Sequence, residues 1–277
     1  MRALLLALVL LITTAGPARA HAGGLTPQDH LSRVTAIDPP LPGVTATMVN
    51  HGTELEIRNG GSTPVAVGGA GDRTGVGGAG DRTGLADHVI APGETYRFRD
   101  ERTTAPQWEI PLGTSVVEGR VDVIPGPNPL WWLLITLALA VGGYLLGRRR
   151  ELLALGVVVV TAGHVWHAVG STLVVTGRSF VPLLLGASGV GLVAWPLTVV
   201  AVVAAVRRKP ATAFVAAVVG AMLVVAGIPD FDSFRFSQLP FAGPADVDRL
   251  LVALTLGGGL GLAAGGFDYL RRTGPTT

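Results

Sequence analysis

Five long apolar stretches after Pro129 constrain this chain more than any other feature. Each runs for roughly 18 to 26 residues, enough to cross about 30 Å of hydrocarbon at a helical rise of about 1.5 Å per residue. The second half of the chain is therefore predicted to be an all-α five-helix transmembrane bundle. Its predicted spans are 130–147, 152–175, 181–206, 211–228 and 247–270.

Positive charge falls at every second gap between these stretches. Arg148–Arg150, Arg207–Lys209 and Arg271–Arg272 follow the first, third and fifth stretches. Cytoplasmic ends of spans carry an excess of Lys and Arg, so these clusters place the C-terminus inside. An odd number of spans then puts the N-terminal region outside. We expect a multi-pass protein of the plasma membrane, with the lipid bilayer as a partner.

The first 20 residues have the pattern of a secretory signal peptide. Arg2 supplies the basic region, residues 3–12 the apolar core, and Ala18-Arg19-Ala20 a cleavage site of the small-x-small kind. The apolar core is too short to span a membrane. Ala20-His21-Ala22 fits the cleavage pattern too, so the mature chain begins at His21 or at Gly23.

Residues 21–124 are predicted to form a small extracytoplasmic all-β sandwich of the Ig-like kind. Val44–Val49 and Glu54–Asn59 form a strand pair around a turn at 50–53, because Leu55 and Ile57 alternate with charged residues. Closely spaced strands with turn residues between them favour a sandwich. The other predicted strands are 64–67, 95–99, 107–112 and 116–124. A Pro-rich linker at 125–129 leads into the bundle, and 273–277 is a cytoplasmic tail.

An exact tandem repeat, VGGAGDRTG, fills 67–75 and 76–84. A calcium-binding β-roll needs its aspartate one position later than Asp72 and Asp81, with an apolar residue two further on. The repeat is therefore interpreted as a duplicated Gly-rich loop.

Composition excludes several classes of function. The chain has no cysteine, which excludes disulfides and zinc-thiolate sites. A net charge of +2 gives no argument for a nucleic-acid partner. The sequence contains no G-x-S-x-G, Walker or H-E-x-x-H motif, so we expect no enzyme.

The most informative polar residues lie in the second apolar stretch. His164 and His167 share a helix face at spacing i, i+3, and polar side chains inside a membrane indicate function. With Met222 of the fourth stretch they would suit Cu(I). Bis-histidine haem ligation would need a second chain. The other interpretations are proton transfer and hydrogen bonding between packed helices.

A second candidate metal site lies outside the membrane. If cleavage precedes His21, that residue offers both an α-amine and an imidazole. With His30 as the nearest candidate for the third arm, and His51 or His88 as alternatives, these nitrogens would form a T-shaped copper site.

Two further patterns concern the last span and the segment before it. Gly257, Gly261 and Gly265 form a stripe that lets helices approach closely, either within the chain or in a homodimer. The gap at 229–244 carries four phenylalanines among polar residues, which favours a segment in the headgroup zone. They are Phe231, Phe234, Phe236 and Phe241.

Four short motifs carry a family resemblance. They are His21-Ala22, Leu55–Asn59, His167–Gly170 and Ser237–Phe241. With the layout, they resemble the uncharacterised exported-domain integral membrane proteins of high-GC Gram-positive bacteria. Less closely, they resemble copper-resistance proteins in which a CopC-like domain is joined to a CopD-like membrane domain. The second resemblance implies a copper ion. The alternative is a non-enzymatic membrane scaffold whose β-domain binds an envelope protein.

Overall fold

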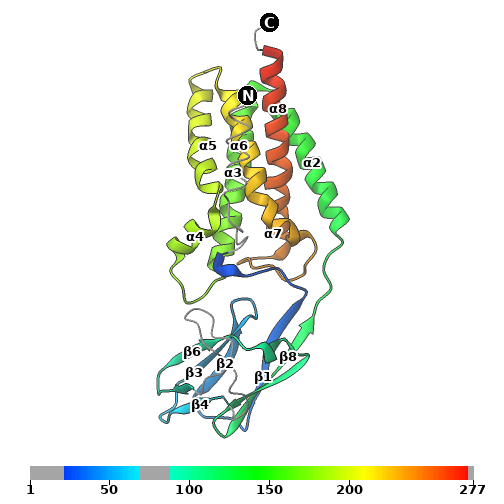
Figure 1. Cartoon of the computed structure of the whole chain (residues 1–277). Helices are drawn as coiled ribbons and strands as arrows, with labels where there is room; N and C mark the ends of the chain where they lie inside the picture. Colours follow the sequence, from blue (N-terminus) through cyan, green and yellow to red (C-terminus); the bar gives the residue numbers. More distant parts are fainter. Residues whose placement is uncertain (1–21, 69–87, 274–277) are drawn as a thin grey trace, which may run out of the picture. The chain divides into compact units, whose positions relative to one another are not determined.

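The computed structural model describes residues 22–68 and 88–273 (Figure 1). The predicted signal peptide, His21, nearly all of the tandem repeat and the last residues of the tail lie outside this range. The chain divides into two compact units. One contains the helices, and the other contains the strands together with residues 236–240.

The β unit consists of two antiparallel sheets. One has the strand order β1-β8-β7-β4-β5 and the other has the order β2-β3-β6. The strands are β1 His30–Asp38, β2 Val44–Val49, β3 Glu54–Asn59, β4 Val65–Val67, β5 His88–Ile90, β6 Thr95–Phe98, β7 Gln107–Leu112 and β8 Ser115–Val123. The predicted pair β2–β3 is confirmed, with Ala46 opposite Ile57. Asn50, His51 and Gly52, in the turn, all have positive φ.

One apolar core fills the β unit with side chains from both sheets. Leu55 and Ile57 come from one sheet, and Ile110 and Leu112 from the other. Trp108 lies opposite Gly119 across the β7–β8 pair, and a Cβ on Gly119 would lie 2.0 Å from its ring. The Trp108 Nε1–H donates to the Ser32 hydroxyl at 2.8 Å, which satisfies this buried donor.

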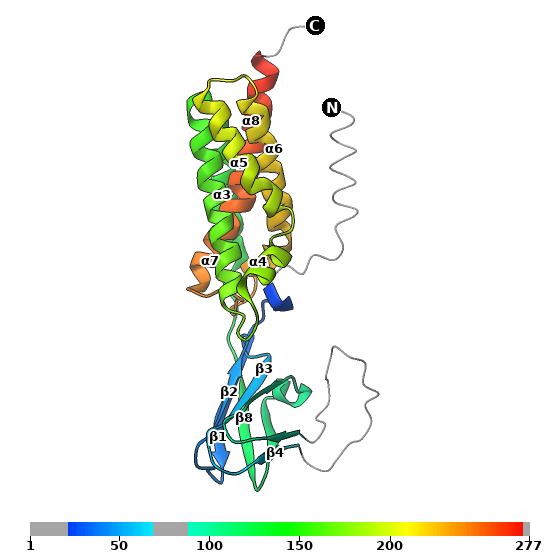
Figure 2. The ribbon, with the colours of Figure 1, turned by 90° about the vertical axis from the view of Figure 1, so that its left-hand side faces the viewer.

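Within residues 22–68 and 88–273, four helices of the helical unit are long and apolar enough to cross a membrane, or five spans if one bent pair counts as one. It comprises α2 Pro129–Gly147, α3 Arg150–Leu173, α4 Phe180–Ser188, α5 Gly191–Val206, α6 Thr212–Gly227, η3 Ile228–Phe234, α7 Ala245–Ala253, η4 Leu254–Gly258 and α8 Gly259–Thr273. Figure 2 shows α3, α5, α6 and α8 running alongside one another. The apolar surface faces outward, as lipid requires, with Trp131, Leu137 and Val199 strongly exposed.

The predicted span at 181–206 is bent in the structure. The segment forms two helices, α4 and α5, which meet at an angle of 81°. Between them Gly189 has φ of +43°, a conformation that favours glycine and ends α4. Apolarity marks a segment for the membrane but carries little information about a bend within it.

Glycines on two faces of the last span let α8 approach two helices. A Cβ on Gly261 would lie 2.2 Å from the Ala140 carbonyl oxygen of α2, and one on Gly266 would lie 2.9 Å from the Ala213 carbonyl oxygen of α6. Gly257 and Gly265 likewise meet α2. The predicted glycine stripe is therefore covered by α2 of the same chain, and a homodimer through this face would require α2 to move away.

The two ends of the bundle differ in charge. Arg148, Arg207 and Arg272 lie where α2, α5 and α8 end, and we call this the basic end. There Asp268 accepts from Tyr144 Oη at 2.8 Å and pairs with Arg272 at 2.9 Å. The opposite end carries the connections at 174–179 and 228–244, and we call it the polar end.

Candidate functional site

A histidine held between two carboxylates lies inside the bundle towards its polar end. His167 Nδ1 lies 2.7 Å from Oδ1 of Asp248, and His167 Nε2 lies 3.2 Å from Oδ2 of Asp230. None of the three side chains is more than 6% exposed. His167 comes from α3, Asp230 from η3 and Asp248 from α7, so this His167 triad ties three elements together.

A second layer of polar groups supports the triad. Ser233 Oγ donates to Oδ2 of Asp248 at 3.2 Å. Arg249 Nε donates to the Ser233 carbonyl oxygen at 3.0 Å, and its Nη1 donates to Asp246 at 2.7 Å. The Arg249 guanidinium also lies over the Trp132 ring, 5.9 Å from the centroid. These contacts fix the positions of η3 and α7, and therefore of both carboxylates.

An aromatic ring covers one face of the imidazole. Phe241 stacks on His167, with ring centroids 6.4 Å apart and planes 9° from parallel. A Cβ on Gly170 would lie 2.1 Å from the Phe241 ring, so glycine is required beside it. The Ala242 N–H donates to the Gly170 carbonyl oxygen at 3.0 Å, which holds this segment against α3.

His164 lies one turn deeper in α3 and has a different environment. Trp195 Nε1–H of α5 donates to His164 Nδ1 at 3.1 Å, so Nδ1 is an acceptor. A Cβ on Gly191 would lie 2.6 Å from His164 Cε1, so the ring fills the space that this glycine leaves at the start of α5. His164 is therefore placed as a neutral imidazole between α3 and α5.

Hydrogen-bonding capacity fixes the number of protons in the triad. A neutral imidazole has one N–H donor and one acceptor nitrogen, and an ionised carboxylate only accepts. Contacts from both ring nitrogens to carboxylates therefore require a second proton, and we place it on the ring because an imidazole is ordinarily more basic than a carboxylate. With both carboxylates ionised, the triad then carries a single net negative charge.

The residues predicted to bind metal come from several elements of the chain. His164 and His167 lie on α3, and Met222 of α6 lies in the apolar core of the bundle with Leu223. His30 begins β1 in the other unit and is exposed, and His21 lies outside the described residues. Over residues 22–68 and 88–273, no group of three or more His, Asp or Glu side chains is arranged to hold a metal ion.

The intramembrane histidines already have partners that a Cu(I) ion would have to replace. Cu(I) favours soft, uncharged donors such as thioether and neutral imidazole. Both nitrogens of His167 face carboxylates, and Nδ1 of His164 accepts from Trp195. The two carboxylates contact opposite edges of the imidazole, so they do not converge on one point. The arrangement suits a proton better than a metal ion.

The residues that sequence reasoning missed are the partners of His167. The segment 229–244 was expected in the headgroup zone, but Phe234 is fully buried and Phe241 nearly so. Asp230, Ser233, Asp248 and Arg249 in and beside this segment are also buried. The charged residues Asp246, Asp248 and Arg249 at the start of the fifth predicted span were the available signal.

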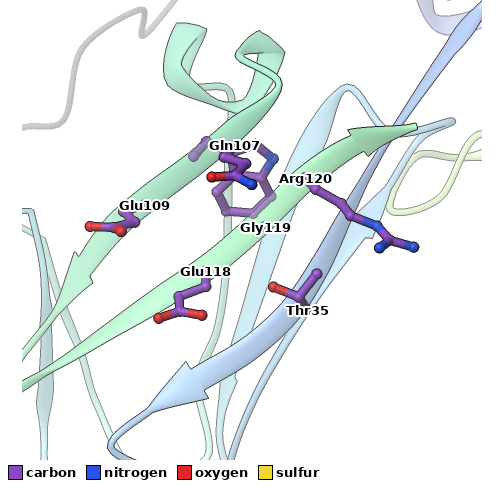
Figure 3. Close-up of a pocket in the computed structure, with 7 residues that line it drawn as sticks. Thr35, Gln107, Glu109, Glu118, Gly119 and Arg120 are labelled. Carbon is purple, nitrogen blue, oxygen red and sulfur yellow. The ribbon is translucent and has the colours of Figure 1, made fainter. Parts of the chain in front are cut away.

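The β unit carries a polar cavity of about 540 Å³ on the β1–β8–β7 sheet (Figure 3). Glu109 and Glu118 lie directly opposite one another on β7 and β8, and Gln107 lies opposite Arg120. Like charges in this register disfavour the strand pair, so a cationic ligand or side chain would be accommodated there. The lining residues are Thr35, Gln107, Trp108, Glu109, Glu118, Gly119 and Arg120.

In comparisons with known proteins, no family model, no curated protein and no solved structure matches this chain. The functional argument therefore depends on the geometry of the described residues.

Proposed function

We propose that this protein is a proton-linked membrane protein in which the His167 triad takes up and releases a proton. The observation that carries the proposal is the contact of both ring nitrogens of one buried imidazole with carboxylates from two other elements. Ionisable groups lose their hydration inside a membrane, so an arrangement of three of them is costly there. Ionisable groups at such positions usually serve a function.

The proton would control the connection between α6 and α7. With the proton present, one cation is shared by Asp230 and Asp248 and holds η3 and α7 to α3. Without it, the two carboxylates repel each other in a medium of low dielectric constant. The neutral ring then has one N–H, so one carboxylate loses its hydrogen bond. Loss of the proton then loosens the contact of η3 and α7 with α3, which is an electrostatic switch of the kind used by pH-sensitive proteins.

The proposed topology follows from charge. Five spans, counting α4 and α5 as one, with the basic end in the cytoplasm, place the polar end and the Ig-like β-domain outside. The arginines at the ends of α2, α5 and α8 support this orientation. The protein would then belong to the cell membrane and respond to the pH of the envelope.

Infrared difference spectroscopy of the reconstituted protein tests the proposal. A change of pH should alter carboxyl bands in the wild-type protein. The double variant Asp230→Asn/Asp248→Asn should lose this change, while Asp246→Asn should keep it because the Asp246 side chain is 80% exposed. A wild-type spectrum identical to that of the double variant would overturn the proposal.

Copper binding outside the membrane stays a prediction. It depends on His21 being the first residue of the mature chain, with His30 as a further ligand. N-terminal sequencing and metal analysis of the purified protein test it together. A mature chain that begins at Gly23 would remove this site without affecting the His167 triad.

A second candidate function is that of an envelope interaction module. The opposed Glu109 and Glu118 in the β-domain cavity favour a partner that presents a basic side chain. Crosslinking of the wild-type protein should then capture an envelope protein that Glu109→Gln/Glu118→Gln does not. Equal capture by both would exclude this cavity as the binding surface.

A further inference from the structure

Polar side chains follow one side of α3 through half of the bundle. Thr161, His164, His167 and Ser171 recur every three or four residues, so they lie along one side of the helix. All four are buried. At about 1.5 Å per residue, the row extends for about 15 Å along the helix.

Neighbouring helices continue this row at each level. Thr161 Oγ1 lies 2.8 Å from Thr198 Oγ1 of α5. His164 accepts from Trp195, and His167 contacts Asp230 and Asp248. The groups that face His167 are therefore two carboxylates from η3 and α7, with Arg249 of α7 behind them and His164 on its own helix.

The outermost member of the row is Ser171, two residues before the end of α3. Its hydroxyl oxygen is buried and has no hydrogen-bond partner among the described residues. Buried hydroxyl groups are almost always satisfied, either by protein or by ordered water. The hydroxyl of Ser171 therefore offers an unfilled hydrogen-bonding position for a water molecule at the outer end of the row.

The other half of the bundle is apolar in its interior. Leu153, Val157 and Val160 of α3 pack there in one cluster with side chains of α5, α6 and α8. Every buried ionisable side chain among the described residues is located towards the polar end. They are His164, His167, Asp230, Asp248 and Arg249. A layer about 10 Å thick, from Leu153 to Val160, thus separates the row from the basic end.

We infer that the His167 triad is reached by water from the polar end alone, and that the apolar layer closes the bundle towards the basic end. This inference rests on the proposed function in one respect only, namely that a proton is what reaches His167 through the water. It makes the protein a sensor of the compartment at its polar end rather than a proton channel, because the described residues offer no polar route through the apolar layer.

The absence of cysteine makes a direct accessibility test available. Single variants Ser171→Cys and Val157→Cys would be treated with a membrane-impermeant thiol reagent in right-side-out and inside-out vesicles. Arg178→Cys and Lys209→Cys, both in exposed connections, report the polar end and the basic end respectively. Ala168→Cys, on the same side of α3, replaces Ser171→Cys if that variant does not fold.

Ser171→Cys should react only in vesicles in which Arg178→Cys reacts, and Val157→Cys should react in neither. Three results would each overturn the inference. The first is reaction of Ser171→Cys from the basic end, and the second is reaction of Val157→Cys in the folded protein. The third is that neither Ser171→Cys nor Ala168→Cys reacts from either side. The infrared experiment is independent of thiol access. If the thiol variants are not labelled but the infrared carboxyl changes persist, only the inferred water entry is contradicted. If Ser171→Cys is labelled as expected but the carboxyl bands do not change with pH, only the proton proposal is contradicted.

Discussion

The two units of this protein place charge in opposite ways. In the β unit the core is apolar and the ion pairs lie at the surface, as for Arg33 and Asp122, whose side chains are 57% and 28% exposed. In the bundle apolar side chains also cover the outer surface, and the most buried groups include the ion pair of His167 with Asp248, whose side chains are 6% and 1% exposed. Water solvates the first kind of pair, while the second depends entirely on its partners.

This difference determines how strongly each unit is destabilised when one member of an ion pair is lost. A solvated pair can lose one member at little cost, because water replaces the lost partner. A buried pair that loses one member leaves an uncompensated charge, which is strongly destabilising. The same chemical change should therefore have very different consequences in the two units.

The largest effect is expected from removing one carboxylate in each unit. Asp248→Ala should lower the free energy of unfolding by about 3–5 kcal/mol, because His167 and Ser233 lose a buried partner. Glu56→Ala removes the partner of Arg97 in the β unit and should cost at most about 1 kcal/mol. Thermal unfolding of the full chain in detergent measures both. Equal losses would contradict the comparison.

A smaller effect is expected from crowding the glycine contacts of the bundle. Gly261→Val places a side chain against the α2 backbone and should cost about 1–3 kcal/mol or more. Gly142→Val is the matched control, because a Cβ there meets nothing within 4 Å. Helix content and melting temperature should fall only for the first variant. If both variants behave alike, α8 does not depend on this close approach to α2.

In the β unit the comparable test removes a buried hydrogen bond. Ser32→Ala removes the acceptor of the Trp108 indole N–H and should cost about 1–3 kcal/mol, because a buried donor is left unsatisfied. Ser62→Ala, at an exposed position, should cost almost nothing. Chemical denaturation of the full chain distinguishes the two. A neutral Ser32→Ala would mean that water reaches the indole.

The smallest effect concerns acid sensitivity of the β unit. Burial lowers the pKa of His51 below its ordinary value of 6.5, and a hydrogen bond with the Gln238 backbone partly opposes this. The folded state then binds fewer protons, so the stabilisation is present above pH 6.5 and is lost as the pH falls below it. His51→Gln should flatten this part of the stability profile, measured by hydrogen exchange of β2 and β3. An unchanged profile would assign the acid sensitivity elsewhere.

Sequence reasoning succeeded where a pattern is local. Alternation located β3, and apolarity located the helices of the bundle. It missed β1, because the buried Ser32 and a bulge between Val34 and Ala36 interrupt the alternation. The three residues of β5 are too few to show a period.

The site was only half predictable for the same reason. His167 was found because a polar residue in an apolar stretch is conspicuous. Its partner Asp248 lies 81 residues away in the sequence, and a packed bundle is needed to bring the two together. Asp230 lies in a segment whose phenylalanines suggested a membrane surface. No local pattern indicates which distant carboxylates meet a given imidazole.

The most direct test of the central claim is nitrogen NMR of the protein with ¹⁵N-labelled histidine in lipid nanodiscs, with the His167 signals assigned from His167→Gln. The account predicts that the His167 ring carries protons on both nitrogens, converts reversibly to a singly protonated ring as the solution is titrated, and becomes neutral in Asp230→Asn/Asp248→Asn. A His167 ring that stays neutral, or that never changes over the pH range in which the protein is folded, would contradict it.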